Sequence, residues 1–151
     1  MAAFGIDIDR DRICVFKKAL SKHDALCKLV DALFATGGIP DREAFRKAVC
    51  DREAVMSTGI GQGLAIPHVR FEGVRKPAVG VGISKQGIDF DTLDNQVVHV
   101  IVLFAMPAGS QKEYLGLLAQ VMTALKEPKF LERLVECDTP EEVEDVLAED
   151  V

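Results

Sequence analysis

Residues 97–104 read Val97-Val98-His99-Val100-Ile101-Val102-Leu103-Phe104, an almost wholly apolar run that is rich in β-branched side chains. A strand with one face in water would alternate apolar and polar residues, whereas a strand covered on both faces is apolar throughout. The run therefore predicts a central strand. A sheet that contains such a strand needs helices packed against both of its faces.

Helix-forming segments lie on both sides of this run in the sequence. Ser21 is a suitable N-cap for a helix over residues 23–34, and the next helix opens at Pro40-Asp41 and ends near Val55. After residue 110 the apolar positions keep helical spacing to the end of the chain. Thr139 and Pro140 are typical of the start of the last of these helices.

Shorter strand-like runs cover residues 64–66 and 78–83. Gly80 and Gly82 in the second run predict that one face of that strand is pressed close to another part of the backbone. Residues 13–16 form one short apolar run within an otherwise irregular lead-in. Two helices, then strands, then three helices are the expected order of elements.

The bulk composition is that of a single domain spanning residues 1–151. The 151 residues are 48% hydrophobic, which is enough for a core of normal size. The formal net charge of −6 argues against nucleic acid as a partner, because phosphate backbones bind basic surfaces. Four widely spaced cysteines favour reduced thiols in a cytoplasm, and no apolar run has the ~20 residues needed to span a bilayer.

A glycine-rich approach to a histidine is the strongest functional pattern. It reads Ser57-Thr58-Gly59-Ile60-Gly61-Gln62-Gly63-Leu64-Ala65-Ile66-Pro67-His68. Glycines let backbone N–H groups approach phosphate oxygens, and histidine is a neutral nucleophile near pH 7. We therefore interpret His68 as a phosphoryl acceptor that leaves the end of a strand in a direction set by Pro67. The alternative is a half-buried, hydrogen-bonded and inert histidine.

Other candidate groups are weaker. Arg52 and Arg70 could bind a phosphoryl group in bidentate fashion, although each taken alone is more often a solvated surface charge. His23 and Cys27 have metal-ligand spacing on a helix, but two ligands do not make a site, and we expect no bound metal. His99 is expected to be a strand residue near an edge or end. The aspartates of residues 87–95 indicate a hairpin-like connection, and no lysine completes a nucleotide-binding loop.

From about Ile13 to the C-terminus the chain resembles the enzyme IIA domain of the fructose/mannitol class of the bacterial phosphotransferase system, which includes the nitrogen-regulatory IIA proteins. The motifs that carry the resemblance are Arg52-Glu53, residues 57–61 and residues 64–68. Weaker matches are residues 76–79, 87–90 and 103–107. The resemblance implies a three-layer α/β/α sandwich with a mixed sheet of about five strands.

The resemblance also implies a function. His68 would accept a phosphoryl group from a histidine-containing phosphocarrier protein and pass it to a IIB domain or use it to control a regulated protein. Arg52 would steady the phosphoryl group, backbone near Thr58, Gly59, Gly61 and Gly63 would bind it, and no cofactor would be needed. Such a protein acts in the cytoplasm, in sugar transport or in nitrogen regulation. The sequence shows no attached IIB or membrane segment, which favours the regulatory type.

One position departs from the family pattern. Family members usually carry a second histidine in a His-Leu pair at the start of the helix after the sheet, and here that pair is Tyr114-Leu115. A phenol can donate a hydrogen bond but cannot become an imidazolium. We expect Tyr114 to lie near His68 and partly to replace that histidine. The alternative function is a regulatory binding module of the same fold that is not phosphorylated.

Overall fold

Two long antiparallel strands form the centre of the fold: β7 (Ala78–Ile88) and β8 (Val98–Pro107). The computed structural model describes residues 2–3, 6–8, 10–55, 57–92, 94–109 and 111–149. As predicted, β8 is central and buried on both faces, and it extends three residues beyond the apolar run.

The main sheet is mixed and has the strand order β3-β7-β8-β5-β4, with β6 also paired to β8. Its shorter strands are β3 (Ile13–Phe16), β4 (Gly59–Gly61), β5 (Leu64–Ala65) and β6 (His68–Phe71). The β7–β8 and β4–β5 pairs are antiparallel and the other pairs are parallel. The mixed sheet is confirmed, with six strands where about five were expected.

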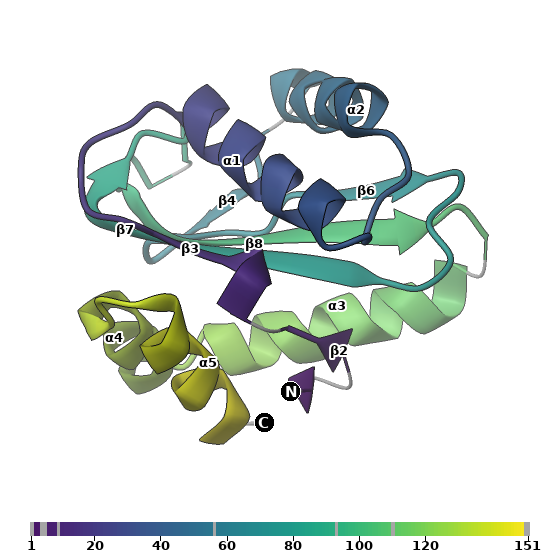
Figure 1. Cartoon of the computed structure of the whole chain (residues 1–151). Helices are drawn as coiled ribbons and strands as arrows, with labels where there is room; N and C mark the ends of the chain where they lie inside the picture. The colour runs from purple at the N-terminus through teal and green to yellow at the C-terminus, as the bar shows by residue number, and fades with distance from the viewer. Residues whose placement is uncertain are drawn as a thin grey trace.

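Helices cover both faces of this sheet, as expected (Figure 1). On one face lie α1 (Lys22–Ala35) and α2 (Arg42–Val55). On the other lie α3 (Gln111–Leu125), α4 (Pro128–Glu136) and α5 (Pro140–Glu149). The lead-in contains β1 (Ala2–Ala3), β2 (Ile6–Asp7) and the 3₁₀ helix η1 (Arg10–Arg12). No described helix is both long and apolar enough to cross a bilayer.

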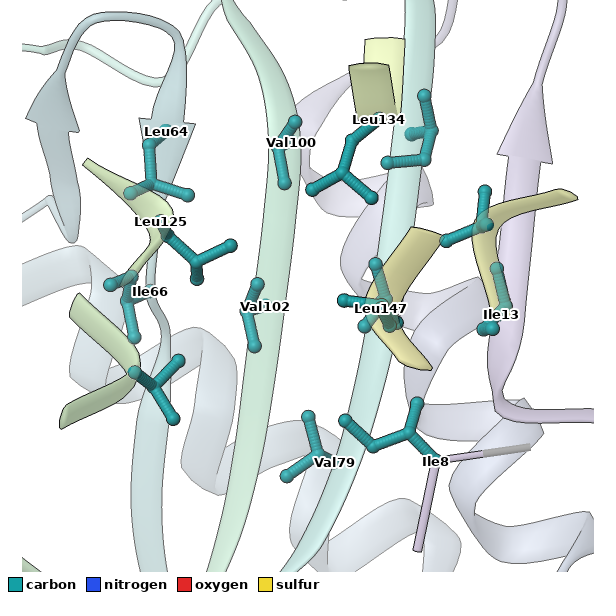
Figure 2. Packing of buried hydrophobic residues seen from close by; sticks show 14 of the residues in the cluster. Ile8, Ile13, Leu64, Ile66, Val79, Val100, Val102, Leu125, Leu134 and Leu147 are labelled. Atoms are coloured by element: carbon teal, nitrogen blue, oxygen red, sulfur yellow. The ribbon is translucent and has the colours of Figure 1, made fainter. Parts of the chain in front are cut away.

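Alternation along β8 divides its side chains between two hydrophobic cores. Val100, Val102 and Phe104 join the core beneath α3, α4 and α5, whereas Ile101 and Leu103 join the core beneath α1 and α2. Figure 2 shows part of the first core, in which Leu125, Leu134 and Leu147 of the three C-terminal helices meet the sheet. Each such side chain contributes roughly 1.5–3 kcal/mol by leaving water.

The glycines of β7 allow α1 to approach the sheet closely. A Cβ at Gly80 would lie 3.6 Å from the Leu33 side chain, and one at Gly82 would lie 3.3 Å from Leu29 and 3.0 Å from Phe16. The predicted close approach is therefore present. Its partners are mainly side chains, with backbone taking part only at Gly80, 3.6 Å from the Arg12 carbonyl oxygen.

The segment around His68 differs from the sequence expectation. Our prediction ended a strand near Ile66 and missed both β4 and β6, but β6 begins at His68 and pairs with β8 in parallel. Pro67 has no N–H to donate, and its carbonyl accepts the Phe104 N–H at 2.8 Å. The proline therefore separates β5 from β6, which both pair with β8. His68 is the first residue of a strand, whereas the sequence predicted that it follows the end of one.

The connection between β7 and β8 is fastened by a carboxylate. Asp94 accepts hydrogen bonds from the backbone N–H groups of Gln96 and Gln62, each at 3.1 Å, and from the Thr92 hydroxyl at 2.9 Å. These bonds, the one from Gln96 first, lower the pKa of Asp94. The bond to Gln62 joins this connection to the turn between β4 and β5.

Stability should depend on Asp94 in a pH-dependent manner. Its lowered pKa means that the folded state stabilises the ionised form of the Asp94 carboxyl group relative to the unfolded state. This contribution to stability is fully present above the ordinary aspartate pKa, and it is lost as the pH falls through the lowered pKa. Asp94→Asn should therefore lower the urea midpoint at about pH 7 and lower it by less at about pH 2, below the ordinary aspartate pKa. Equal effects of the substitution at both pH values would contradict this assignment.

Candidate functional site

A cavity of about 580 Å³ lies beside the start of β6, and we call it the His68 cavity. It is bounded by the end of α2, by β6, by the end of β8 and by the first turns of α3. Its walls therefore come from both helical layers. The lining residues are Arg52, His68, Val69, Arg70, Met106, Ala108, Tyr114, Leu115 and Leu118.

His68 is half-buried and its ring orientation is set by the backbone. Its Nδ1 lies 2.9 Å from the carbonyl oxygen of Ile66. A carbonyl can only accept a hydrogen bond, so Nδ1 carries the hydrogen and the neutral ring keeps its lone pair on Nε2. Nε2 is thereby prepared to act as a nucleophile or as a hydrogen-bond acceptor.

The charged groups that line the cavity are cationic. Arg52 lies in the last turn of α2, and Arg70 lies two residues after His68 on β6, so it shares the face of the strand with His68. None of the nine lining residues is acidic. Two guanidinium groups beside a nucleophilic nitrogen suit a dianionic group such as a phosphoryl.

Tyr114 is also part of this cavity. It lies in the first turn of α3, is half-buried and packs against the core beneath the C-terminal helices. Leu115 follows it and is 63% exposed. The structure thus brings together His68, Arg52, Arg70 and Tyr114 from three different elements of the chain.

Sequence reasoning missed a buried ionic cluster that anchors this region. The Glu53 carboxylate accepts the backbone N–H of Thr58 at 3.1 and 3.2 Å and also the Thr58 hydroxyl. The Lys22 ammonium lies 3.2 Å from Glu53 and 4.7 Å from the centre of the Phe90 ring. The cluster ties the start of α1 and the end of α2, which carries Arg52, to the loop that leads to His68. A carboxylate next to Arg52 was the signal that could have revealed it.

The glycine-rich stretch before Leu64 lies outside the lining of the His68 cavity. Thr58, Gly59, Gly61 and Gly63 do not line the His68 cavity. Thr58 is held by Glu53, Gly59 pairs with Ala65 in the β4–β5 hairpin, and Gly63 lines a separate cavity with His99. Their predicted role in binding a phosphoryl group stays a prediction, whereas their positions show a tight hairpin before β6.

Neither of the other two histidines lines the His68 cavity. His23 lies 3.5 Å from Cys27 Sγ and 3.8 Å from Cys50 Sγ, and no group of three ligands among the described residues could hold a metal ion. His99 lies near the start of β8, with Nδ1 bonded to the Ser84 carbonyl at 2.8 Å. It is near a strand end, as expected, but its strand is central.

A comparison with protein families decides the relationship. The model of the family described as "Phosphoenolpyruvate-dependent sugar phosphotransferase system, EIIA 2" matches residues 8–150. The chain belongs to this EIIA 2 family. The resemblance found in the sequence is therefore confirmed, and it extends over nearly the whole chain.

Curated relatives carry the same assignment. The chain is 34% identical over 129 residues to the PTS system fructose-specific EIIA component of Haloferax volcanii, covering 85% of this chain and 84% of that protein. It is 32% identical over 126 residues to the PTS system fructose-specific EIIABC component of Bacillus subtilis. That match covers 83% of this chain and only 20% of the longer relative.

Solved structures show the same fold. The nitrogen regulatory protein IIA-Ntr from Neisseria meningitidis superposes with a TM-score of 0.81 at 25% identity, covering 91% of this chain and 94% of that one. Enzyme IIA mannitol in its complex with phosphorylated enzyme IIB mannitol from Escherichia coli superposes with a TM-score of 0.77 at 21% identity, covering 95% and 98%. The EIIA 2 fold thus accounts for the layers and the mixed sheet.

Proposed function

We propose that this EIIA 2 protein is a phosphocarrier that receives a phosphoryl group on His68 from a histidine-containing phosphocarrier protein. The observation that carries the proposal is the bond from His68 Nδ1 to the Ile66 carbonyl, which leaves Nε2 as the nucleophile in a cavity lined by Arg52 and Arg70. Family membership supports the same chemistry.

In the proposed step, the Nε2 lone pair attacks the phosphorus of the donor's phosphohistidine. A new N–P bond forms at His68 while the donor N–P bond breaks, and its electron pair returns to the donor imidazole. Nδ1 keeps its hydrogen and the Ile66 carbonyl stabilises the positive charge that the ring gains. Arg52 and Arg70 offset the charge of the phosphoryl oxygens, so catalysis consists mainly of positioning and charge stabilisation.

The proposed acceptor is a IIB domain, or a regulated protein whose binding responds to the charge gained at His68. The structure of the Escherichia coli complex of IIA with phosphorylated IIB is the support for a IIB partner. The fructose-specific relatives match this chain in sequence and the nitrogen-regulatory neighbour matches it in fold, so both roles are retained in the proposal. We further propose that residues 1–151 act as one IIA domain in the cytoplasm.

A second candidate function is a binding module of the same fold that is never phosphorylated. Tyr114 in the His68 cavity favours it, because the resemblance led us to expect a histidine there.

Incubation with phosphoenolpyruvate, enzyme I and a phosphocarrier protein, followed by intact mass measurement, distinguishes these functions. We expect a gain of about 80 Da, the mass of one phosphoryl group. A IIA of known competence is labelled in parallel. No gain in this chain while that IIA is labelled would overturn the phosphocarrier proposal.

Tyr114→Phe tests whether the phenol assists transfer. The hydroxyl is the hydrogen-bond donor that α3 adds to the His68 cavity, and a bond to a charged group is worth about 1.5–3 kcal/mol. We expect the rate of phosphohistidine formation or its lifetime to fall by about 10- to 150-fold. Thr123→Val, which removes a hydroxyl from the same helix at an exposed position outside this cavity, is the control. An unchanged rate and lifetime in Tyr114→Phe would remove Tyr114 from the mechanism.

A further inference from the structure

A second, separate pocket is lined by cations. It has a volume of about 330 Å³ and lies between η1, the α1–α2 connection and the β6–β7 loop. Figure 1 shows the end of α1 and the start of β7 at the same end of the sheet. Its charged lining residues are Arg12, Arg75 and Lys76, and it shares no lining residue with the His68 cavity. We call it the Arg75 pocket.

The charge of the Arg75 pocket is opposite to that of the chain. Acidic residues outnumber basic ones by 24 to 18, yet none of the ten residues that line this pocket is acidic. Neither Arg75 nor Lys76 takes part in any ion pair found among the described residues. Three acids, Asp11, Asp41 and Glu72, are adjacent in the sequence to residues that line this pocket, but none of them lines it. Asp41 caps α2 by accepting the Ala44 N–H at 3.1 Å. The charges that line this pocket are therefore three cations, which together attract an anion.

The walls of the Arg75 pocket are fixed by direct contacts. Arg12 donates from Nε to the Thr36 hydroxyl at 2.9 Å and from Nη2 to the Thr36 carbonyl at 3.3 Å. These bonds hold its guanidinium at the end of α1. A Cβ at Gly73 would lie 2.8 Å from Pro40, and one at Gly38 would lie 2.9 Å from the Ala78 side chain. Glycine at these two positions lets the connections pack together and shape the pocket.

We propose that the Arg75 pocket binds a small oxyanion of the phosphate class, either free phosphate or a phosphate monoester. Two arginines and a lysine from two segments, η1 and the β6–β7 loop, match a group with two negative charges and three or more acceptor oxygens. The volume suits a small molecule. This site is independent of the proposed phosphoryl transfer at His68. It would tie the β6–β7 loop to the α1–α2 connection when it is occupied.

Amide NMR during titration with sodium phosphate, and separately with glycerol 3-phosphate, tests the proposal. Sodium chloride at matched ionic strength is the reference for general salt effects. We expect saturable shifts at the amides of Gly37, Gly38 and Gly73, which line the pocket. Tighter binding of glycerol 3-phosphate would assign the pocket to a monoester, and equal or tighter binding of phosphate would assign it to the free ion. Shifts confined to Val69 and Arg70 would place binding in the His68 cavity and overturn the proposal.

The double variant Arg75→Gln, Lys76→Gln should weaken this binding by at least about 10-fold, because it removes two of three cations. Both side chains are exposed, so the fold should persist. The matched control is Lys126→Gln, Lys129→Gln, which changes net charge equally at exposed positions outside this pocket. Equal affinity in the two double variants, or the absence of saturable shifts in the unmodified protein, would overturn the proposal. Neither result depends on whether His68 is phosphorylated.

Discussion

His68→Ala is expected to abolish phosphorylation by the phosphocarrier system, with a loss of more than about 1000-fold in the rate of label incorporation. In the proposed step the imidazole supplies the nucleophilic Nε2, and no other lining residue of the His68 cavity is a histidine, cysteine or lysine. Intact mass measurement after incubation with phosphoenolpyruvate, enzyme I and the phosphocarrier protein would show the unmodified mass.

His23→Ala and His99→Ala are the controls, because neither side chain lines the His68 cavity. Both variants should gain one phosphoryl group at the normal rate. Urea unfolding of His68→Ala checks that the loss of label does not come from loss of the fold. Full labelling of a folded His68→Ala protein would show that the acceptor is another residue.

Glu53→Ala should be the most destabilising of the substitutions considered, lowering the free energy of unfolding by about 3 kcal/mol. The Glu53 side chain is 4% exposed and bonds both the Thr58 backbone and the Lys22 ammonium. Its removal leaves the Thr58 N–H and a largely buried ammonium without their partner. Urea unfolding followed by circular dichroism measures the change.

Two further variants separate the contribution of the Thr58 hydrogen bond from that of the ion pair with Lys22. Glu53→Gln keeps an oxygen that can accept the Thr58 N–H but removes the charge facing Lys22, so an intermediate loss is expected. The double variant Lys22→Met, Glu53→Ala should lose less stability than Glu53→Ala alone, because no ammonium is stranded. Asp51→Asn, which breaks the exposed pair with Lys47, is the control and should change little. A Glu53→Ala midpoint equal to that of Asp51→Asn would refute the buried cluster.

The layers of this fold could be predicted because each local signal agreed with the tertiary structure. The apolar run at 97–104 indicated a strand that is buried on both faces. Ser21 and Thr139 indicated helix starts, and their hydroxyls accept the capping hydrogen bonds from backbone N–H groups at 3.1 and 3.2 Å. β4 and β6 could not be predicted in this way. Each has only three or four residues, two of the three residues of β4 are glycines, and β6 directly follows a proline.

The residues gathered at the candidate site could be predicted in part for a similar reason. His68 and Arg52 stand within continuous motifs, whereas the Glu53–Lys22 contact joins residues 31 positions apart in the sequence, a pairing that only the packing of α1 on α2 creates. The glycine-rich stretch was given a binding role from its composition. The β4–β5 hairpin places this stretch outside the lining of the His68 cavity, and the sequence pattern did not predict that hairpin.

The position of the His68 cavity between the helical layers has a mechanical consequence. Val69 belongs to the packing beneath α1 and α2, whereas Met106 and Leu118 belong to the core beneath the C-terminal helices, and all three line the cavity. The shape of the His68 cavity therefore depends on the packing of both cores. A large-to-small substitution in either core should increase the mobility of the residues that line the His68 cavity, at a temperature at which the sheet is still folded.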